Sequence, residues 1–180
     1  MIELYKSLIE KSVWVAIILF FIYCCKFPIH SLFELSSAIG TVVPVTLVIA
    51  SFYITVWWRN NPFEKLPRIF GDYSGVIKYV FNDVPSEKQI DVSIYQNLLL
   101  VRVTIKTDEI QSNTVLGNIV IENGEYILYY NYLTDPKAEY EDKNPKQYGT
   151  CRLKIEKNGV LSGKYWTSRQ TIGDITLYKK

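Results

Sequence analysis

The sequence predicts a membrane α-helical hairpin followed by an all-β domain: two N-terminal transmembrane helices and then a small eight-stranded antiparallel up-and-down β-barrel. Three observations support this fold class. The first third of the 180-residue chain is almost entirely apolar, the remainder alternates apolar with polar residues, and an Asn-Gly pair separates alternating runs at two places. We therefore expect residues 1–61 to form a two-helix anchor and residues 62–180 to form the barrel.

Two uncharged runs predict the helices. The second run, Leu35–Trp58, would span roughly 36 Å as a helix, which exceeds a hydrocarbon core about 30 Å thick. The first run, Ser12–Cys25, is shorter, but apolar residues before it extend it, and the lysines at its ends can reach the headgroups. Residues 26–34 between the runs are too few for anything but a turn, and Pro44 is expected to kink the second helix.

Two other interpretations of this N-terminal segment remain open, a cleaved signal peptide and a buried helical hairpin of a soluble protein. A second, longer apolar run directly after the first favours two transmembrane helices over both. Most basic residues near the anchor lie at the outer ends of the two runs: Lys6, Lys11, Arg59, Lys65 and Arg68. Only Lys26 lies in the turn, so the positive-inside rule places both termini and the barrel in the cytoplasm.

Alternating apolar and polar residues predict eight strands after the anchor. The expected ranges are 72–82, 89–96, 98–107, 113–122, 125–133, 148–157, 159–168 and 170–179. Asn123-Gly124 and Asn158-Gly159 are strong signals for hairpin turns, and residues 134–147 are expected to form a long solvated loop. Closure into a barrel would remove exposed edges, and an open sandwich is the alternative. An eight-stranded barrel is either filled by side chains or holds one small ligand.

The residues that usually carry catalysis are scarce. His30 is the one histidine and lies between the two apolar runs, so Ser-His and Cys-His pairs are not expected in the β domain. The sequence contains no phosphate-binding glycine loop, and its three cysteines lack zinc-site spacing. We expect no enzyme activity, no cofactor and no metal. Residues 1–58 are neutral overall and residues 59–180 carry a net charge of +2, which argues against binding of a DNA or RNA polymer.

Aromatic and hydroxyl residues are the best candidates for ligand binding. Arg169 lies between Thr167 and Thr171, a composition suited to a phosphodiester. Tyrosines could stack on a base and donate hydrogen bonds, and the candidates are Tyr73, Tyr79, Tyr126 and Tyr165. Most strand tyrosines pack in a core, however, and Arg169 could equally be a surface arginine in the turn between the last two strands.

The layout resembles the two-transmembrane, β-strand-rich effectors of CBASS, the bacterial cyclic-oligonucleotide anti-phage defence. The likeness covers the whole chain, including an opening Gly-Asp-Tyr-Ser-Gly segment at residues 71–75 and a closing Tyr-Trp-Thr-Ser-Arg-Gln-Thr-Ile-Gly segment at residues 165–173. The resemblance implies a barrel that binds a cyclic dinucleotide made by a partner nucleotidyltransferase. Binding would drive homo-oligomerisation, and the clustered helices would disrupt the inner membrane and kill the infected cell.

Two functions from other classes stay open: a membrane-tethered barrel for a lipid or another apolar ligand, and a structural docking partner of another membrane protein. The interior of the barrel discriminates among them. A basic, polar pocket would favour the cyclic dinucleotide, a dry apolar cavity would favour the lipid, and a filled interior with a flat aromatic patch would favour docking.

Overall fold

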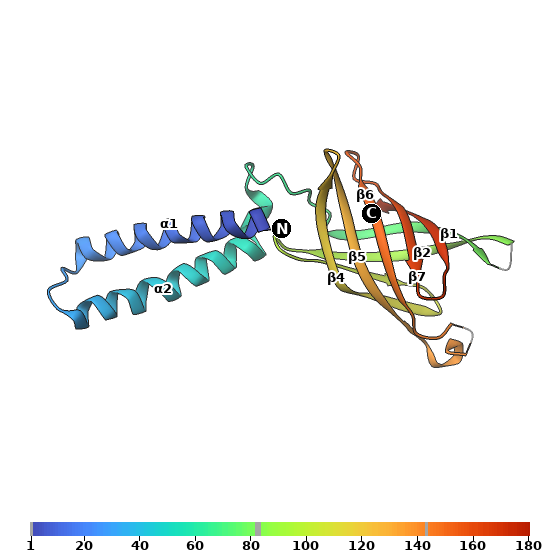
Figure 1. Cartoon of the computed structure of the whole chain (residues 1–180), viewed down its shortest axis with the longest axis horizontal. Helices are drawn as coiled ribbons and strands as arrows, with labels where there is room; N and C mark the ends of the chain where they lie inside the picture. The colour runs from blue at the N-terminus through green and yellow to red at the C-terminus, as the bar shows by residue number, and fades with distance from the viewer. Residues whose placement is uncertain (1, 82–83, 143) are drawn as a thin grey trace. The chain divides into compact units, whose positions relative to one another are not determined.

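A computed structural model describes residues 2–81, 84–142 and 144–180 of the chain. It divides into two compact units, Met1–Pro62 and Phe63–Lys180. The first unit contains helices α1 (Ile2–Lys26) and α2 (Leu32–Thr55) and the short 3₁₀ helix η1 (Trp57–Asn60), and the second unit is all β apart from one short helix (Figure 1). The predicted fold class, two long apolar helices followed by an eight-stranded antiparallel barrel, is confirmed.

Helix α2 begins three residues before the uncharged run, because a capping box fixes its first turn. The Glu34 backbone N–H donates to the Ser31 hydroxyl at 3.2 Å, and the Ser31 N–H donates to the Glu34 carboxylate at 3.0 Å. The charged residue thus belongs to the helix start rather than to the preceding turn. The helix continues past Pro44 and ends at Thr55, where the chain turns into η1.

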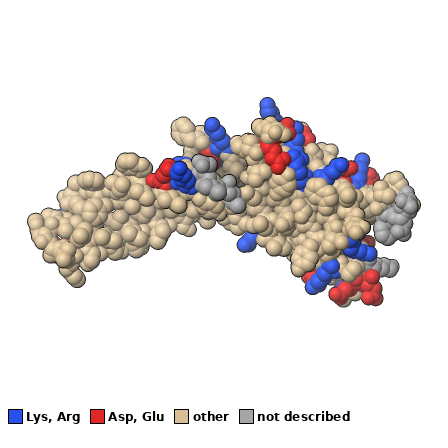
Figure 2. Space-filling view, viewed as in Figure 1, with Lys and Arg blue, Asp and Glu red and all other residues tan. Residues whose placement is uncertain are grey.

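Helices α1 and α2 pack through a stripe of small and β-branched residues. Ala38, Val42 and Thr46 recur every fourth residue of α2 and are the buried side chains of that helix. The Thr46 hydroxyl donates to the Val42 carbonyl at 2.8 Å, so it needs no partner elsewhere. Most other apolar side chains of both helices are exposed, and Figure 2 shows this unit as a largely uncharged surface. Both helices are long and apolar enough to cross a membrane.

Eight antiparallel strands follow in simple sequential order and close into a barrel when β1 pairs with β8. The strands are β1 (Gly71–Phe81), β2 (Val84–Gln96), β3 (Val101–Lys106), β4 (Ile110–Glu122), β5 (Glu125–Pro136), β6 (Tyr148–Ile155), β7 (Leu161–Thr167) and β8 (Ile172–Lys179). The closed sheet rules out the open sandwich. Asn123 and Gly124 both have positive φ, 50° and 80°, as the tight turn between β4 and β5 requires.

Two of the predicted boundaries are wrong in an informative way. Strand β2 begins at Val84 rather than at residue 89, because it forms a long hairpin with β1 that extends beyond the rest of the barrel (Figure 1). The predicted loop at 134–147 starts later, because residues 134–136 continue β5 and pair with residues 110–112. The short helix η2 (Ala138–Tyr140) lies in the remaining loop. Residue 82, the expected end of the first strand, lies outside the described residues.

The linker that precedes β1 fills one end of the barrel, which we call the closed end. Gln96 is fully buried there; its side-chain oxygen accepts from the Ile69 N–H at 2.8 Å, and its amide nitrogen donates to the Pro67 carbonyl at 2.8 Å. The Tyr73 hydroxyl donates to the Ile69 carbonyl at 3.0 Å. Leu66 packs against the core as well. Hydrogen bonds to a backbone N–H and to a backbone carbonyl therefore hold the linker in place, and the linker seals this end of the barrel.

Candidate ligand-binding cavity

The other end of the barrel, which we call the open end, contains a cavity of about 400 Å³. This volume lies within the range of small-molecule sites. The connections β3–β4, β5–β6 and β7–β8 each contribute residues to its lining. The residues lining the cavity combine hydroxyl, aromatic and charged side chains with an apolar minority: Ile77, Tyr79, Lys88, Ile105, Thr107, Glu109, Ile110, Ser112, Tyr130, Tyr132, Thr134, Asn144, Gln147, Cys151, Tyr165, Thr167, Arg169, Thr171 and Ile175.

Two strand glycines make room for the tyrosine rings in the barrel. Tyr132 is paired across the sheet with Gly149, and Tyr165 is paired with Gly173. A methyl group at Gly149 would collide with the Tyr132 ring, and one at Gly173 would lie 2.5 Å from the Tyr165 ring. The rings therefore lie flat over glycine backbone, where any side chain would push them inward.

The polar groups inside the barrel are uncharged at neutral pH. Burial raises the pKa of the Cys151 thiol to about 12 and that of Tyr165 to about 12. Burial also raises the pKa of Tyr130 and of Tyr132, and the neighbouring Cys151 acts in the same direction. All four groups keep their protons, so the three hydroxyls can donate hydrogen bonds and the thiol is a poor nucleophile. No metal-binding cluster of His, Cys, Asp and Glu occurs among the described residues.

Charged side chains gather at the mouth of the cavity. Lys88, on the inner face of β2, forms an ion pair with Glu109 at 3.0 Å. The Asn144 side chain donates to the same carboxylate at 3.2 Å, which ties the loop between β5 and β6 to the turn between β3 and β4. That loop is also fixed by Thr134, whose hydroxyl accepts from the Gln147 N–H at 2.9 Å. At the mouth, strand β2 and the connections β3–β4 and β5–β6 are thus held to one another.

Five of the seven residues proposed from the sequence line this cavity: Arg169, Thr167, Thr171, Tyr165 and Tyr79. Tyr73 and Tyr126 do not. Tyr73 is buried at the closed end, where its hydroxyl holds the linker, and Tyr126 is half-buried against the core. The structure thus separates these two tyrosines from the other five residues.

Arg169 lies in the turn between β7 and β8, between the two strands predicted at 159–168 and 170–179. The Thr167 N–H donates to the Thr171 carbonyl and the Gln170 N–H donates to the Thr167 carbonyl, both at 3.0 Å. Gln170 has a positive φ of 62°. The turn from 156 to 160 has the same two hydrogen bonds, with Gly159 at the corresponding position. The turn brings all three residues to the cavity because β7 and β8 end there.

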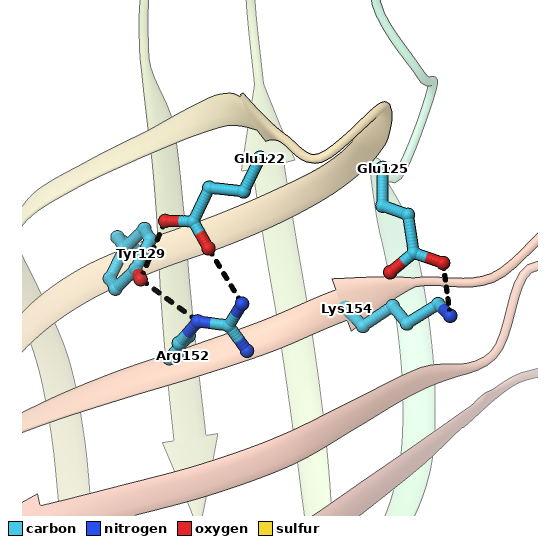
Figure 3. Close-up of polar contacts among 5 residues, drawn as sticks. All are labelled: Glu122, Glu125, Tyr129, Arg152 and Lys154. Carbon is cyan, nitrogen blue, oxygen red and sulfur yellow. Dashed lines mark hydrogen bonds and ion pairs between the residues drawn. The ribbon is translucent and has the colours of Figure 1, made fainter.

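The tyrosines of β5 divide between the two faces of the sheet. Tyr130 and Tyr132 point inward, whereas the Tyr129 hydroxyl, on the outer face, donates to Glu122 at 2.8 Å and accepts from Arg152 at 2.9 Å (Figure 3). Arg152 also pairs with Glu122 at 2.6 Å. The hydrogen bond from Arg152, followed by that from Tyr129, lowers the pKa of Glu122. This cluster links β4, β5 and β6 on the outside and takes no part in the cavity.

Two depressions on the outer wall have volumes of about 570 and 560 Å³, both lined by Lys164 and Asp174. They are lined mainly by outward-facing side chains. The interior cavity is the better candidate site within the barrel because it brings buried hydroxyls, tyrosine rings, Lys88 and Arg169 together.

Several lining residues were not proposed from the sequence, among them Lys88, Glu109, Ser112, Asn144 and Gln147. Ser112 and Lys88 each lie one residue before a predicted strand, 113–122 or 89–96. One signal was available: extended by one residue, the alternation puts Ser112 at an inward position, where a polar residue indicates a wet interior. Glu109, Asn144 and Gln147 come from loops, whose positions depend on closure of the barrel.

The comparisons with known proteins agree with this arrangement. The family described as "Cap15, cyclic dinucleotide receptor domain" matches residues 64–179. A relative from Staphylococcus schleiferi, "CD-NTase-associated protein 15", is 38% identical over 145 residues, which cover 77% of this chain and 79% of the relative. The family match spans the whole barrel, and the relative extends over most of the chain. The chain therefore belongs to the Cap15 family of CBASS effectors.

Proposed function

We propose that this chain is a membrane-anchored receptor whose barrel binds a cyclic dinucleotide, assembles into homo-oligomers and disrupts the bacterial inner membrane, so that the infected cell dies. One observation carries the proposal. A barrel that belongs to a cyclic dinucleotide receptor family has an open end with a cavity, and that cavity is lined by an arginine, a lysine, hydroxyl groups and tyrosine rings.

The chemistry of the cavity suits a cyclic dinucleotide. The Arg169 guanidinium would pair with a phosphodiester through two parallel N–H donors, and Thr167 and Thr171 would add hydroxyl donors from the same turn. Tyr165 and Tyr79 would supply ring faces for a base. Lys88 would be a second cation within reach, once the phosphate replaces Glu109 as its partner.

The anchor supports the output half of the proposal. Apolar side chains cover both helices, and the helices pair through only a narrow stripe of buried residues on α2. A bundle of several such hairpins could therefore bury additional helix surface when the attached barrels gather. We propose that both termini and the barrel lie in the cytoplasm, where a partner nucleotidyltransferase would release its product.

The two other functions receive less support. An apolar ligand would leave the hydroxyls and charges of the cavity without hydrogen-bond partners, which is costly in a buried site. A purely structural docking module would have a filled barrel, whereas this one retains a cavity of about 400 Å³. We propose no catalytic role for any residue of the cavity.

Binding by the full chain in lipid nanodiscs tests the first half of the proposal. Cyclic di-AMP, cyclic di-GMP and cyclic GMP–AMP should include at least one compound that raises the thermal midpoint in proportion to the logarithm of its concentration. The corresponding mononucleotides should not do so at equal phosphate concentration. Dye release from liposomes that contain the full chain should then require the same compound. If none of the compounds shifts the midpoint, or if mononucleotides act equally, the receptor assignment is wrong.

A further inference from the structure

Two buried polar atoms on one side of the cavity have no hydrogen-bond partner. They are the Ser112 hydroxyl oxygen and the Gln147 side-chain carbonyl oxygen. Both residues line the cavity. Because folded proteins pair nearly all of their buried polar atoms, two unpaired atoms in one cavity indicate groups available to a ligand.

The fold holds these two groups on either side of one residue. Ser112 of β4 lies directly opposite Thr134 of β5. Thr134 holds Gln147 through its backbone, since the Thr134 N–H donates to the Gln147 carbonyl at 3.0 Å and the Thr134 hydroxyl accepts from the Gln147 N–H at 2.9 Å. Ser112 and Gln147 therefore flank one residue at the mouth. Tyr130 lies deeper, four residues before Thr134 on the same face of β5.

Arg169 lies on another side of the barrel. It precedes β8, and in a closed barrel of eight sequential strands β4 lies four strands from β8, on the opposite wall. A cyclic dinucleotide carries its anionic phosphodiesters and its base edges on different parts of the molecule. A phosphodiester paired with Arg169 leaves a base edge to face the wall with Ser112 and Gln147.

We propose that Gln147 and Ser112 read the hydrogen-bonding edge of one base, and that they select a base with an exocyclic amine. This inference rests on the proposed function, because it assigns a role inside the same cavity. The Gln147 carbonyl oxygen accepts from the amine, and the Ser112 hydroxyl donates to the adjacent ring nitrogen. Adenine satisfies both groups. Hypoxanthine has an oxygen in place of the amine. This oxygen and the Gln147 carbonyl oxygen are both acceptors, so no hydrogen bond forms between them.

Cyclic di-AMP and cyclic di-IMP provide the test, because in cyclic di-IMP each amine is replaced by an oxygen and the adjacent ring nitrogen carries a proton, so that both hydrogen-bonding positions are reversed. Isothermal titration with the full chain in nanodiscs should show cyclic di-AMP binding about ten- to a hundredfold more tightly. The Gln147→Leu and Ser112→Ala variants should reduce that ratio toward one. Gln147→Glu should retain the ratio even if both affinities fall, because a carboxylate still accepts from the amine. Gln111→Leu, on the outward face of the strand that carries Ser112, is the matched control and should keep the wild-type ratio.

The outcomes separate this inference from the proposed function. If the wild-type chain binds both compounds equally, or if Gln147→Leu keeps the wild-type ratio, the base-reading role is wrong while the receptor assignment stands. If wild type binds neither these compounds nor any other cyclic dinucleotide, the receptor assignment itself fails. A fall in the ratio that also occurs in Gln111→Leu would show a general effect on the barrel and would overturn the inference.

Discussion

Arg169 combines exposure to solvent with a fixed backbone, since the turn that carries it is closed by hydrogen bonds of Thr167 with Gln170 and Thr171. We predict that Arg169→Ala weakens binding of the cyclic dinucleotide by about ten- to a hundredfold, the usual effect of losing a charge-assisted contact. The thermal midpoint without ligand should hardly change, because the exposed side chain contributes little to packing. Titration calorimetry and a thermal scan of the same preparations measure both quantities.

Arg169→Lys is the matched control for that prediction. A lysine keeps the charge but offers a single ammonium group instead of the planar fork, so it should restore only part of the affinity. Equal affinities of wild type and Arg169→Ala would show that Arg169 is an ordinary surface residue. A large loss of stability without ligand would show that it supports the barrel instead.

Gly149 controls the shape of the cavity through Tyr132. A methyl group at Gly149 collides with the end of the Tyr132 ring, so we predict that Gly149→Ala turns the ring into the cavity. Affinity for the ligand should fall by roughly tenfold or more, whereas the overpacking should cost only about 1–3 kcal/mol of stability. Calorimetry of Gly149→Ala beside the double variant Gly149→Ala with Tyr132→Leu tests the mechanism. The double variant should recover part of the affinity. If it does not, the loss of affinity comes from a shift of the backbone and not from the Tyr132 ring.

Sequence alone predicted part of this site, because alternation shows which residues of one strand share a face. Tyr130 and Tyr132 therefore fall on one side of β5 and Tyr129 on the other, but alternation does not say which side is the interior. The turn near Arg169 could be found from its composition. Ser112 and Gln147 could not be joined in this way, because they are 35 positions apart and meet only through the pairing of β4 with β5 and the hydrogen bonds of Thr134.

At the scale of elements, the linker before β1 behaves as part of the barrel because Gln96 satisfies backbone groups on both sides of it. We predict that Gln96→Ala destabilises the barrel by about 2–4 kcal/mol, since the Ile69 N–H and the Pro67 carbonyl lose their partners inside the core. The thermal midpoint should fall by roughly 10 °C. Gln89→Ala, an exposed position on the same strand, should leave it nearly unchanged. Similar midpoints for both variants would contradict the role given to Gln96.

The elements themselves were largely predictable, and the exceptions have physical causes. Long apolar runs and period-two alternation both depend on local sequence, so all eight strands and both helices were expected. The start of α2 depended on the capping box of Ser31 and Glu34, which a count of uncharged residues overlooks. The hydrogen bonds between the linker and Gln96 join residues nearly thirty positions apart, so no local pattern showed them.

For the whole molecule, the charge distribution predicts that the barrel faces the cytoplasm. A fluorescent reporter that folds only in the cytosol, fused after Lys180, should be bright, and alkaline phosphatase at the same position should be inactive. The matched control is each reporter fused in the turn between the helices, after residue 30, where the two results should be reversed. Phosphatase activity after Lys180 would show that the barrel lies outside the cytoplasm, where it has no access to a cytosolic ligand.

The division into two units predicts that ligand binding and toxicity can be separated. Residues 63–180 alone should bind the cyclic dinucleotide without slowing growth, because they lack the helices. Residues 1–62 alone should also be harmless, because nothing gathers them. Only the full chain should arrest growth, and only in cells that make the ligand. Growth curves of the three strains provide the measurement, and toxicity of the isolated barrel would exclude a membrane mechanism.

The sealed closed end makes the barrel a cup rather than a tube. A molecule in the cavity has one route in and the same route out, since residues 66–69 occupy the other end. Any change that widens or narrows the mouth without touching the bound ligand therefore speeds or slows arrival and departure by the same factor. For the proposed ligand, the inner walls would set the affinity, and the mouth around Glu109 would set the rate at which binding reaches equilibrium. Substitutions at the mouth would therefore change how fast the receptor responds without changing the ligand concentration at which it responds.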